Sequence, residues 1–263
     1  MNRADLPIGV FDSGIGGLTV VRALRRALPE ESIIYLGDTA RVPYGNKSHA
    51  TIRRYALQAG EILARYQPKL LVIACNTASA HGLAALQAAA PCPVIGVIEP
   101  GAEAAAQASG PVGVLGTLAT IQSGAYEDAI HRRNPQAVIH SLACPLLVSL
   151  AEEGWLDDPI TDAVCRRYLN QLPFEVQTVV LGCTHYPVLL PSLARTRPGT
   201  LWLESGELTT NAVERLLQGS LGFRTASAKG DLRILLTDAG SRLKDVGERF
   251  LSEPLEVVDL VEM

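Results

Sequence analysis

The stretch "VVLGCTHYPVLL" (residues 179–190) begins as an apolar run of the kind that forms a buried strand, and then changes character. Residues 183–185 supply a thiol, a hydroxyl and an imidazole in succession where the run ends. The stretch "KLLVIACN" (69–76) behaves in the same way, because its apolar run ends at Cys75. Two strands that each end on a thiol indicate one structural plan used twice in the chain.

Strand-like and helix-like segments alternate along the chain. "IGVFD" (8–12) is followed by "LTVVRALRRALP", in which apolar residues recur at helical spacing. Further strand-like runs lie at 32–38, 69–76 and 93–99, again with helical segments between them. This alternation predicts an α/β protein in which a mostly parallel sheet is covered by helices on both faces.

The second half of the chain replays the strand order of the first. "VGVLGT" (112–117) lies 104 residues after "IGVFDS", "VIHSLA" (138–143) lies 105 after "IIYLGD", and "LWLES" (201–205) lies 107 after "VIGVI". Cys183 lies 108 residues after Cys75. These similar offsets predict two similar α/β domains related by pseudo-twofold symmetry.

The last part of the chain, from residue 211 onwards, has no counterpart in this repeat. We expect this tail to pack back onto the first half, so that the chain crosses between the domains twice. The predicted division is a first domain of residues 1–98 plus 211–263 and a second domain of residues 99–210.

Composition and charge are those of a soluble globular protein. Hydrophobic residues make up 48% of the chain and the net charge is −4, so the basic excess of a nucleic-acid-binding protein is absent. No long apolar segment precedes the first strand, which argues against a secretory signal. Polar residues and prolines interrupt the uncharged stretch 70–98, which predicts a buried strand and helix rather than a membrane span. Five cysteines without a C-x-x-C pair predict reduced thiols in the cytoplasm.

The two cysteines that end strands are predicted to share a cleft. Ligands of open α/β sheets bind beyond the carboxyl ends of the strands, so two facing domains would place Cys75 on one wall and Cys183 on the other. Each cysteine precedes residues suited to opening a helix or turn, and a helix N-terminus is expected to lower the pKa of such a thiol towards neutrality. Cys92, Cys144 and Cys165 are expected to be small buried hydrophobic residues.

Two facing thiols allow three kinds of chemistry. A zinc site normally takes four ligands, and spacing indicates only Cys75, Cys183 and His185. A redox pair usually lies close together in sequence. A pair of bases fits better, because inversion of a carbon centre requires proton removal from one face and delivery to the other. We therefore expect acid–base chemistry and no metal.

A glycine-rich turn and a long loop accompany the predicted cleft. "FDSGIGGLT" (11–19) matches neither the dinucleotide nor the P-loop glycine spacing, and it is interpreted as a tight strand-to-helix turn with Asp12 or Ser13 as the N-cap. "GDTARVPYGNKS" (37–48) is longer than a simple connection, and Tyr44 and Gly45 are expected to wall the cleft. A pyridoxal enzyme would need an activated lysine, and no lysine of the sequence ends a strand within a polar cluster.

Five motifs together resemble a known family. "GVFDSGIGGLTV", "YLGDTARVPYGNKS", "VIACNTASA", "PVIGVIEPG" and "LGCTHYPVLLPSL" occur in the order and spacing of bacterial glutamate racemases, over most of residues 8–210. The resemblance implies cofactor-independent interconversion of L- and D-glutamate, which supplies D-glutamate for peptidoglycan. It also implies that Cys75 and Cys183 are the catalytic acid–bases, with Asp12 as the partner of Cys75.

The same resemblance assigns further residues. It implies that His185 and Glu152 assist at Cys183. The positions that match the substrate-binding residues of the family are Asp12, Ser13, Pro43, Tyr44, Gly45, Asn76, Thr77, Thr184 and His185. It further implies a cytoplasmic homodimer that binds glutamate and needs neither a metal nor another cofactor.

Two rival functions fit parts of the pattern. A racemase or decarboxylase of the same two-cysteine architecture would act on aspartate, hydantoins or malonates, but "CTH" rather than "CTE" at 183–185 favours the glutamate branch. A two-lobed amino-acid-binding protein would need no paired thiols and usually carries an export signal.

Overall fold

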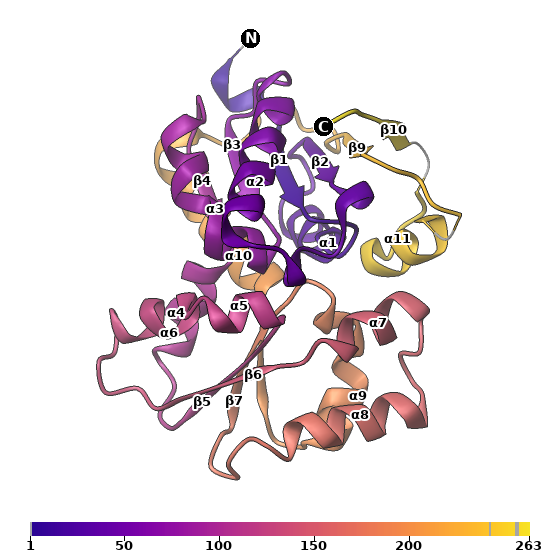
Figure 1. The fold of residues 1–263 in the computed structure, drawn as a ribbon. Coiled ribbons are helices and arrows are strands. Elements are labelled where there is room, and N and C mark those ends of the chain that lie inside the picture. Colours follow the sequence, from indigo (N-terminus) through magenta and orange to yellow (C-terminus); the bar gives the residue numbers. More distant parts are fainter. Residues whose placement is uncertain (1, 242, 256–257) are drawn as a thin grey trace.

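The computed structural model describes residues 2–241, 243–255 and 258–263, which form two α/β lobes (Figure 1). The strands of the first lobe are β1 (Ile8–Asp12), β2 (Ile33–Gly37), β3 (Leu70–Ile73), β4 (Val94–Gly96), β9 (Leu232–Leu236) and β10 (Val258–Leu260). Those of the second lobe are β5 (Val112–Gly116), β6 (Ile139–Ala143), β7 (Thr178–Gly182) and β8 (Leu201–Glu204). Within the described residues every pair of neighbouring strands is parallel, which confirms the predicted fold class.

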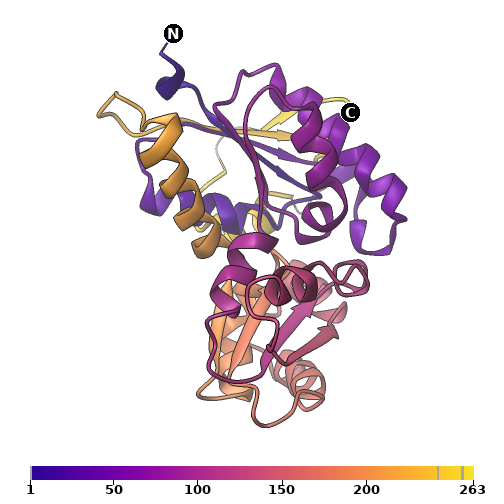
Figure 2. The same cartoon turned by 90° about the vertical axis from the view of Figure 1, so that its left-hand side faces the viewer.

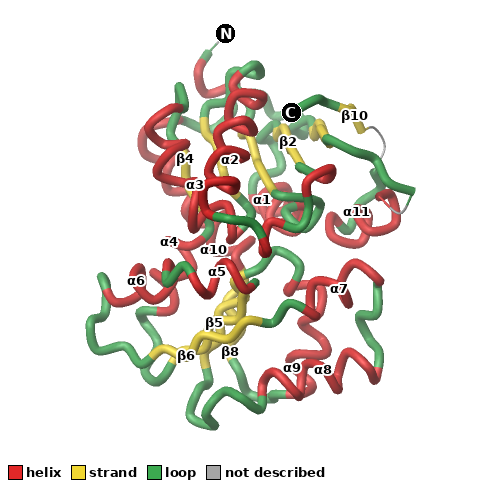
Figure 3. The backbone as a smooth tube through the Cα atoms, in the orientation of Figure 1, coloured by secondary structure: helices red, strands yellow, loops and turns green. Residues whose placement is uncertain are grey.

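Helices connect these strands and surround both sheets (Figure 3). The α-helices are α1 (Leu18–Ala27), α2 (His49–Ala64), α3 (Asn76–Ala89), α4 (Ile98–Ala105), α5 (Leu118–Gln122), α6 (Ala125–His131), α7 (Leu146–Glu153), α8 (Pro159–Leu169), α9 (Leu190–Thr196), α10 (Ser205–Leu216) and α11 (Leu243–Leu251). Short 3₁₀-helical turns are η1 (Arg3–Asp5), η2 (Thr39–Arg41), η3 (Tyr44–Asn46) and η4 (Tyr186–Leu189), and η5 (Leu217–Leu221) is a π-helical turn.

Alternate residues of a central strand pack into different cores. In β1, Val10 belongs to a cluster with Leu18 and Val21 of α1, whereas Phe11 belongs to a cluster with Ile52 of α2. A strand buried on both faces reads as a continuous apolar run, as "IGVFD" does. The cluster around Val10 continues into α7 and η4, so the two lobes share part of one core.

The two sheets share one strand order. The order β2-β1-β3-β4 in the first sheet corresponds to β6-β5-β7-β8 in the second. Ile33 pairs with Ile8 as Ile139 pairs with Val112, so the β2-to-β6 offset is 106 residues and the predicted 105 was wrong. The β4-to-β8 offset likewise shifts from 107 to 108. Apolar strands look alike after a slip of one residue, although such a slip exchanges their two faces.

The C-terminal tail completes the first sheet. β9 pairs with β2, and β10 pairs with β9, so the tail packs onto the first lobe as expected. On the return path α10 packs against α1 and α4, and Figure 2 shows it, in orange, alongside the first lobe. The chain therefore crosses between the lobes twice. The domain boundaries at 98/99 and 210/211 stay a prediction.

The uncharged stretch 70–98 folds as β3, α3, β4 and the first residue of α4. It is the buried strand-and-helix unit that the sequence predicts, with Cys75 between β3 and α3. Within the described ranges of the chain no helix has the length and apolarity that crossing a membrane requires.

A buried ion pair ties the N-terminal segment and the segment after η5 to the first sheet. Lys69 and Glu31 are buried, and Lys69 Nζ lies 2.7 Å from Glu31 Oε2. The ammonium also donates to the carbonyl oxygens of Ala4 (2.6 Å) and Gly222 (3.1 Å). Glu31 Oε1 accepts a hydrogen bond from Arg224 N at 2.9 Å. Lys69 is therefore a structural residue.

Substitution Lys69→Met should destabilise the protein, because it leaves the Glu31 carboxylate buried without its counter-ion. Removing one partner of a buried pair costs about 3–5 kcal/mol, and urea unfolding followed by circular dichroism should show a loss of that size. The double variant Lys69→Met/Glu31→Gln should recover part of it. A loss below about 1 kcal/mol, the value typical of exposed pairs, would contradict the structural role.

Candidate active site

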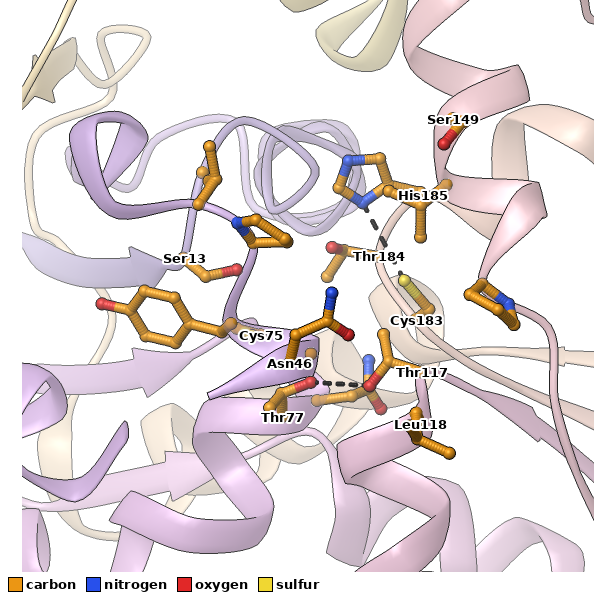
Figure 4. Close-up of a pocket in the computed structure, with 18 of the residues that line it drawn as sticks. Ser13, Asn46, Cys75, Thr77, Thr117, Leu118, Ser149, Cys183, Thr184 and His185 are labelled. Atoms are coloured by element: carbon orange, nitrogen blue, oxygen red, sulfur yellow. Dashed lines mark hydrogen bonds between the residues drawn. The ribbon is translucent and has the colours of Figure 1, made fainter. Parts of the chain in front are cut away.

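A cavity of about 260 Å³ opens between the lobes, beyond the carboxyl ends of both sheets. Cys75 follows β3 and Cys183 follows β7, and both thiols line this cavity (Figure 4). The predicted shared cleft is therefore present, with one thiol on each wall. The other predicted site residues that line it are Ser13, Pro43, Tyr44, Gly45, Asn76, Thr77, Glu152, Thr184 and His185. Asp12 does not line the cavity.

Cys75 occupies the N-terminal end of α3 and is buried. Its Sγ accepts a hydrogen bond from Ala78 N at 3.4 Å. Burial, and then the negative charge of Asp12, raise the pKa of Cys75 to about 12, although hydrogen bonds from Ser13 and Ala78 act in the opposite direction. The expectation that the helix N-terminus brings this pKa towards neutrality was therefore wrong. At neutral pH Cys75 is a thiol.

Asp12 is fully buried at the end of β1. Its carboxylate accepts hydrogen bonds from Gly14 N at 2.9 Å and from Thr184 Oγ1 at 3.5 Å. Burial raises the pKa of Asp12, while the charge of His185 and these hydrogen bonds lower it in part. Asp12 therefore joins the turn of the first lobe to the wall of the second, and it influences Cys75 through its charge.

Close approach explains the glycines of the turn after β1. A Cβ atom built on Gly16 would lie 2.4 Å from His185 Nδ1, and one built on Gly17 would lie 2.5 Å from Asp12 Cβ. Neither position has room for a side chain. Gly17 is also the N-cap residue of α1, so the prediction that Asp12 or Ser13 caps this helix was wrong.

On the second wall a thiol, an imidazole and a carboxylate form a chain. Cys183 Sγ lies 3.9 Å from His185 Nδ1, and His185 Nε2 lies 3.0 Å from Glu152 Oε1. Burial alone would lower the pKa of His185, but its interactions with Cys183 and Glu152 outweigh burial and raise the pKa to about 10. His185 is therefore an imidazolium at neutral pH, and it stabilises negative charge on the sulfur of Cys183. The helical turn η4 begins after His185, so Cys183 caps no α-helix.

Hydroxyl and amide groups of both lobes meet beside the thiols. Thr77 Oγ1 lies 2.9 Å from Thr117 Oγ1 and 3.1 Å from Thr120 Oγ1, which links α3 of the first lobe to α5 of the second (Figure 4). Asn76 Oδ1 accepts a hydrogen bond from the Tyr126 hydroxyl at 2.7 Å. Its buried Nδ2 has no hydrogen-bond partner among the described residues. Since an unpaired buried donor is costly, Asn76 is suited to donating to a bound ligand.

The loop between β2 and α2 forms the rim of the cavity. The Tyr44 hydroxyl donates to Asp38 Oδ2 at 2.5 Å, and Arg41 Nε lies 2.6 Å from the same oxygen. Thr237 Oγ1 donates to Asp38 Oδ1 at 2.9 Å. Burial and the hydrogen bond to Asp38 raise the pKa of Tyr44, so its phenol stays protonated. The hydroxyl of Tyr44 is thus engaged in holding the loop, and the residue contributes a wall to the cavity.

Several lining residues were not predicted from the sequence. They are Gly14, Val42, Asn46, Thr117, Leu118, Pro145, Leu146, Val148 and Ser149. Thr117 occupies the place in the second repeat that Ser13 occupies in the first, 104 residues earlier, so the repeat itself was a usable signal. Residues 145–149 carry no motif, and the packing of α7 alone brings them to the cavity.

The arrangement fits proton transfer best among the three kinds of chemistry that facing thiols allow. The five cysteines are free, and in the described part of the chain no group of three or more His, Cys, Asp or Glu side chains is arranged to hold a metal ion. Burial and Asp12 raise the pKa of Cys75, whereas an imidazolium lies beside Cys183, so the two thiols have different electrostatic surroundings. One thiol can then accept a proton while the other supplies one.

The chain is similar to proteins of one family. Residues 8–213 match the model of the Asp/Glu/hydantoin racemases. The glutamate racemase of Geobacter metallireducens is 48% identical over 252 residues, which cover 94% of this chain and 93% of that protein. The crystal structure of Francisella tularensis glutamate racemase in complex with D-glutamate has a TM-score of 0.93 and 38% identity and covers 98% of both chains. That of Thermus thermophilus glutamate racemase with β-chloro-D-alanine has a TM-score of 0.91 and 42% identity, covering 100% of this chain and 99% of that one.

His185 should remain protonated far above the ordinary range of histidine. Because its pKa is raised, the imidazolium stabilises the fold fully below about pH 6.5, the unperturbed value, and this contribution is lost as the pH rises through about 10. Imidazole ¹⁵N shifts followed over the alkaline range should show this midpoint, and Glu152→Gln should lower it. A midpoint close to that of an unperturbed histidine would contradict the assigned chain of contacts.

Proposed function

The chain belongs to the Asp/Glu/hydantoin racemase family and interconverts L- and D-glutamate, and we propose that Cys75 and Cys183 act as its two bases on opposite faces of the substrate. The observation that carries this proposal is the placement of the two thiols on opposite walls of one cavity. The D-glutamate that forms serves peptidoglycan synthesis, a role that follows from the activity.

From L-glutamate, the Cys183 thiolate removes the Cα proton, and the electron pair of the broken C–H bond remains on Cα. The Cys75 thiol then delivers its proton to the opposite face, so its S–H bond breaks as the new C–H bond forms. Turnover leaves Cys183 as thiol and Cys75 as thiolate, and the reaction from D-glutamate uses the same groups in exchanged roles. Because the pKa of Cys75 is raised to about 12, Cys75 is protonated at rest, which suits it to deliver the proton in the reaction from L-glutamate.

Each thiol has its own assisting groups in this scheme. Asp12 serves Cys75, since its negative charge makes the Cys75 thiolate a stronger base once it forms. His185 serves Cys183 as a fixed positive charge, and Glu152 keeps that charge in place. Preorganised charges of this kind lower the barrier to forming a carbanion within a closed site.

Neutral donors are proposed to hold the carboxylates of the substrate. Among the described residues that line the cavity there is no Lys or Arg. Asn76 supplies the unpaired Nδ2 and also begins α3, whose free N–H groups favour anions. The Ser13, Thr77 and Thr184 hydroxyls add further hydrogen-bonding groups, and residues 43–45 complete the wall. The Francisella tularensis relative was solved with D-glutamate, which supports glutamate as the ligand.

A cytoplasmic location is part of the same proposal. Both catalytic thiols must stay reduced, and the five cysteines of the chain are free. The mechanism requires no cofactor. The homodimer that the family resemblance implies stays a prediction, which analytical ultracentrifugation tests.

Glutamate should be racemised faster than aspartate by about 10–200-fold, the discrimination that one methylene provides. The cavity is expected to fit the longer side chain and to place its distal carboxylate among the neutral donors. Loss of optical rotation, followed for each L-amino acid at equal concentration, measures the ratio. Comparable rates would transfer the chain to the aspartate branch of the family.

Substitutions Cys75→Ser and Cys183→Ser should each slow racemisation by about 10²–10⁴-fold, the usual contribution of a general acid–base group. Elimination from a 3-chloroglutamate separates their roles, because it needs deprotonation from one face only. The Cα–H electron pair forms the Cα=Cβ bond as chloride leaves, and the enamine product hydrolyses to 2-oxoglutarate and ammonia.

The Cys75→Ser variant, which keeps Cys183, should release chloride from the L-enantiomer alone, and Cys183→Ser should release it from the D-enantiomer alone. Cys92→Ser is a matched control, because Cys92 is half-buried outside the cavity. Loss of both eliminations in both catalytic variants would end the two-base proposal.

A further inference from the structure

The C-terminal helix α11 of the first lobe packs against the catalytic groups of the second. Figure 1 shows α11, in yellow, next to α7. The Phe250 ring meets the His185 ring edge-on, with centroids 5.1 Å apart and an interplanar angle of 73°. Phe250 is fully buried, so the imidazole rests on a fixed surface. The tail therefore reaches the thiol–imidazole–carboxylate chain, although none of its described residues lines the substrate cavity.

Arg249 of the same helix binds the C-terminal end of α7. Its Nη1 donates to the carbonyl oxygens of Ala151 (3.2 Å) and Glu152 (3.3 Å). The last carbonyls of a helix lack intrahelical partners, and a positive charge is favoured at that end. Gly154, with a φ of 79°, ends the helix. A Cβ built on Gly154 would lie 2.5 Å from Arg249 Nη2, so the guanidinium lies directly against this glycine.

The residue held in this way carries the carboxylate that pairs with His185. The Glu152 side chain is 48% exposed, so burial does little to fix it. It borders the substrate cavity on one side and a second cavity of about 290 Å³, next to Val246 of α11, on the other. The last turn of α7 sets where the Glu152 backbone lies relative to His185.

We propose that Arg249 is a positioning residue, which holds the last turn of α7 so that the Glu152 carboxylate stays on His185 while Phe250 fixes the plane of the imidazole. The proposal rests on the two-base function given above. It assigns Arg249 to the Cys183 half of the reaction, because Cys75 and Asp12 have no contact with α7 among the hydrogen bonds of the described residues.

Racemisation itself does not reveal such an assignment. The two enantiomers have equal free energy, so kcat/KM for L- and D-glutamate must fall together in any variant. Elimination from the enantiomers of 3-chloroglutamate is free of this constraint, because each enantiomer loses its proton to one thiol. The L-enantiomer reports on Cys183 and the D-enantiomer on Cys75.

The test compares Arg249→Met, which keeps the aliphatic stem without donors, with Arg25→Met. Arg25 is a matched control, since it binds Glu253 (3.0 Å) just beyond α11 and has no hydrogen bond to α7. Arg249→Met should slow elimination from the L-enantiomer by about tenfold, the loss expected for one charge-assisted contact, and should leave the D-enantiomer within about twofold. Arg25→Met should change both rates by less than about twofold, because the Arg25–Glu253 pair touches neither α7 nor the cavity.

A pH profile gives a second readout that general loosening of the tail would not produce. Among the described residues, Cys183, Glu152 and Asp12 are titratable groups that act on His185. Without Glu152 in place the His185 imidazolium loses its proton at a lower pH. The alkaline fall in the rate of elimination from the L-enantiomer should therefore move to lower pH in Arg249→Met, and less so in Arg249→Lys. Equal losses on both enantiomers, or an unmoved limb, would overturn the role of Arg249 and leave the two-base function standing. Loss of enantiomer preference in the Cys75→Ser and Cys183→Ser variants would instead overturn that function.

Discussion

The close approach of the glycine-rich turn after β1 to the segment after β7 is the contact on which the site depends. Gly16 leaves no space for a Cβ beside His185, and Thr19 Oγ1 lies 2.9 Å from the Thr184 carbonyl oxygen. These contacts join the lobes within the first turn beyond each strand, and one hydrophobic cluster continues from α1 into α7 and η4 behind them. Two thiols at the strand ends are thereby held on opposite walls of a small cavity, which is what proton transfer across one carbon requires.

The backbone of the two halves is duplicated, but their charges are not. Asp12 at the end of β1 corresponds to Gly116 at the end of β5, because the two strands hold equivalent places in the two sheets. Conversely, His185 of the second half corresponds to Thr77 of the first, 108 residues earlier, and Thr77 is neutral. A carboxylate therefore acts on Cys75 and an imidazolium on Cys183. The two thiols therefore have surroundings of opposite charge, and in the two-base proposal this difference distinguishes the acid from the base.

The sequence predicted most of what lies at the strand ends, and less of what tertiary packing adds. Both thiols could be located from the sequence, because a buried strand gives an apolar run and the end of that run is marked by polar residues. Gly17 as the helix cap and the raised pKa of Cys75 were missed, since each depends on how closely other chain segments approach. The residues of α7 that line the cavity were missed for the same reason. Thr117 is different, because it is the equivalent of Ser13 in the second half of the chain and could have been predicted from the repeat.

The central claim is that two different groups exchange protons with the two faces of glutamate, and isotope content at early times tests it most directly. L-glutamate with protium at Cα is incubated with the enzyme in deuterium oxide, and both enantiomers are analysed by mass spectrometry before a tenth of the substrate has turned over. The two-base account predicts that the D-glutamate formed carries deuterium while the remaining L-glutamate keeps its protium. D-glutamate that retains the original protium would mean that a single group removes and returns the proton, and would contradict the account.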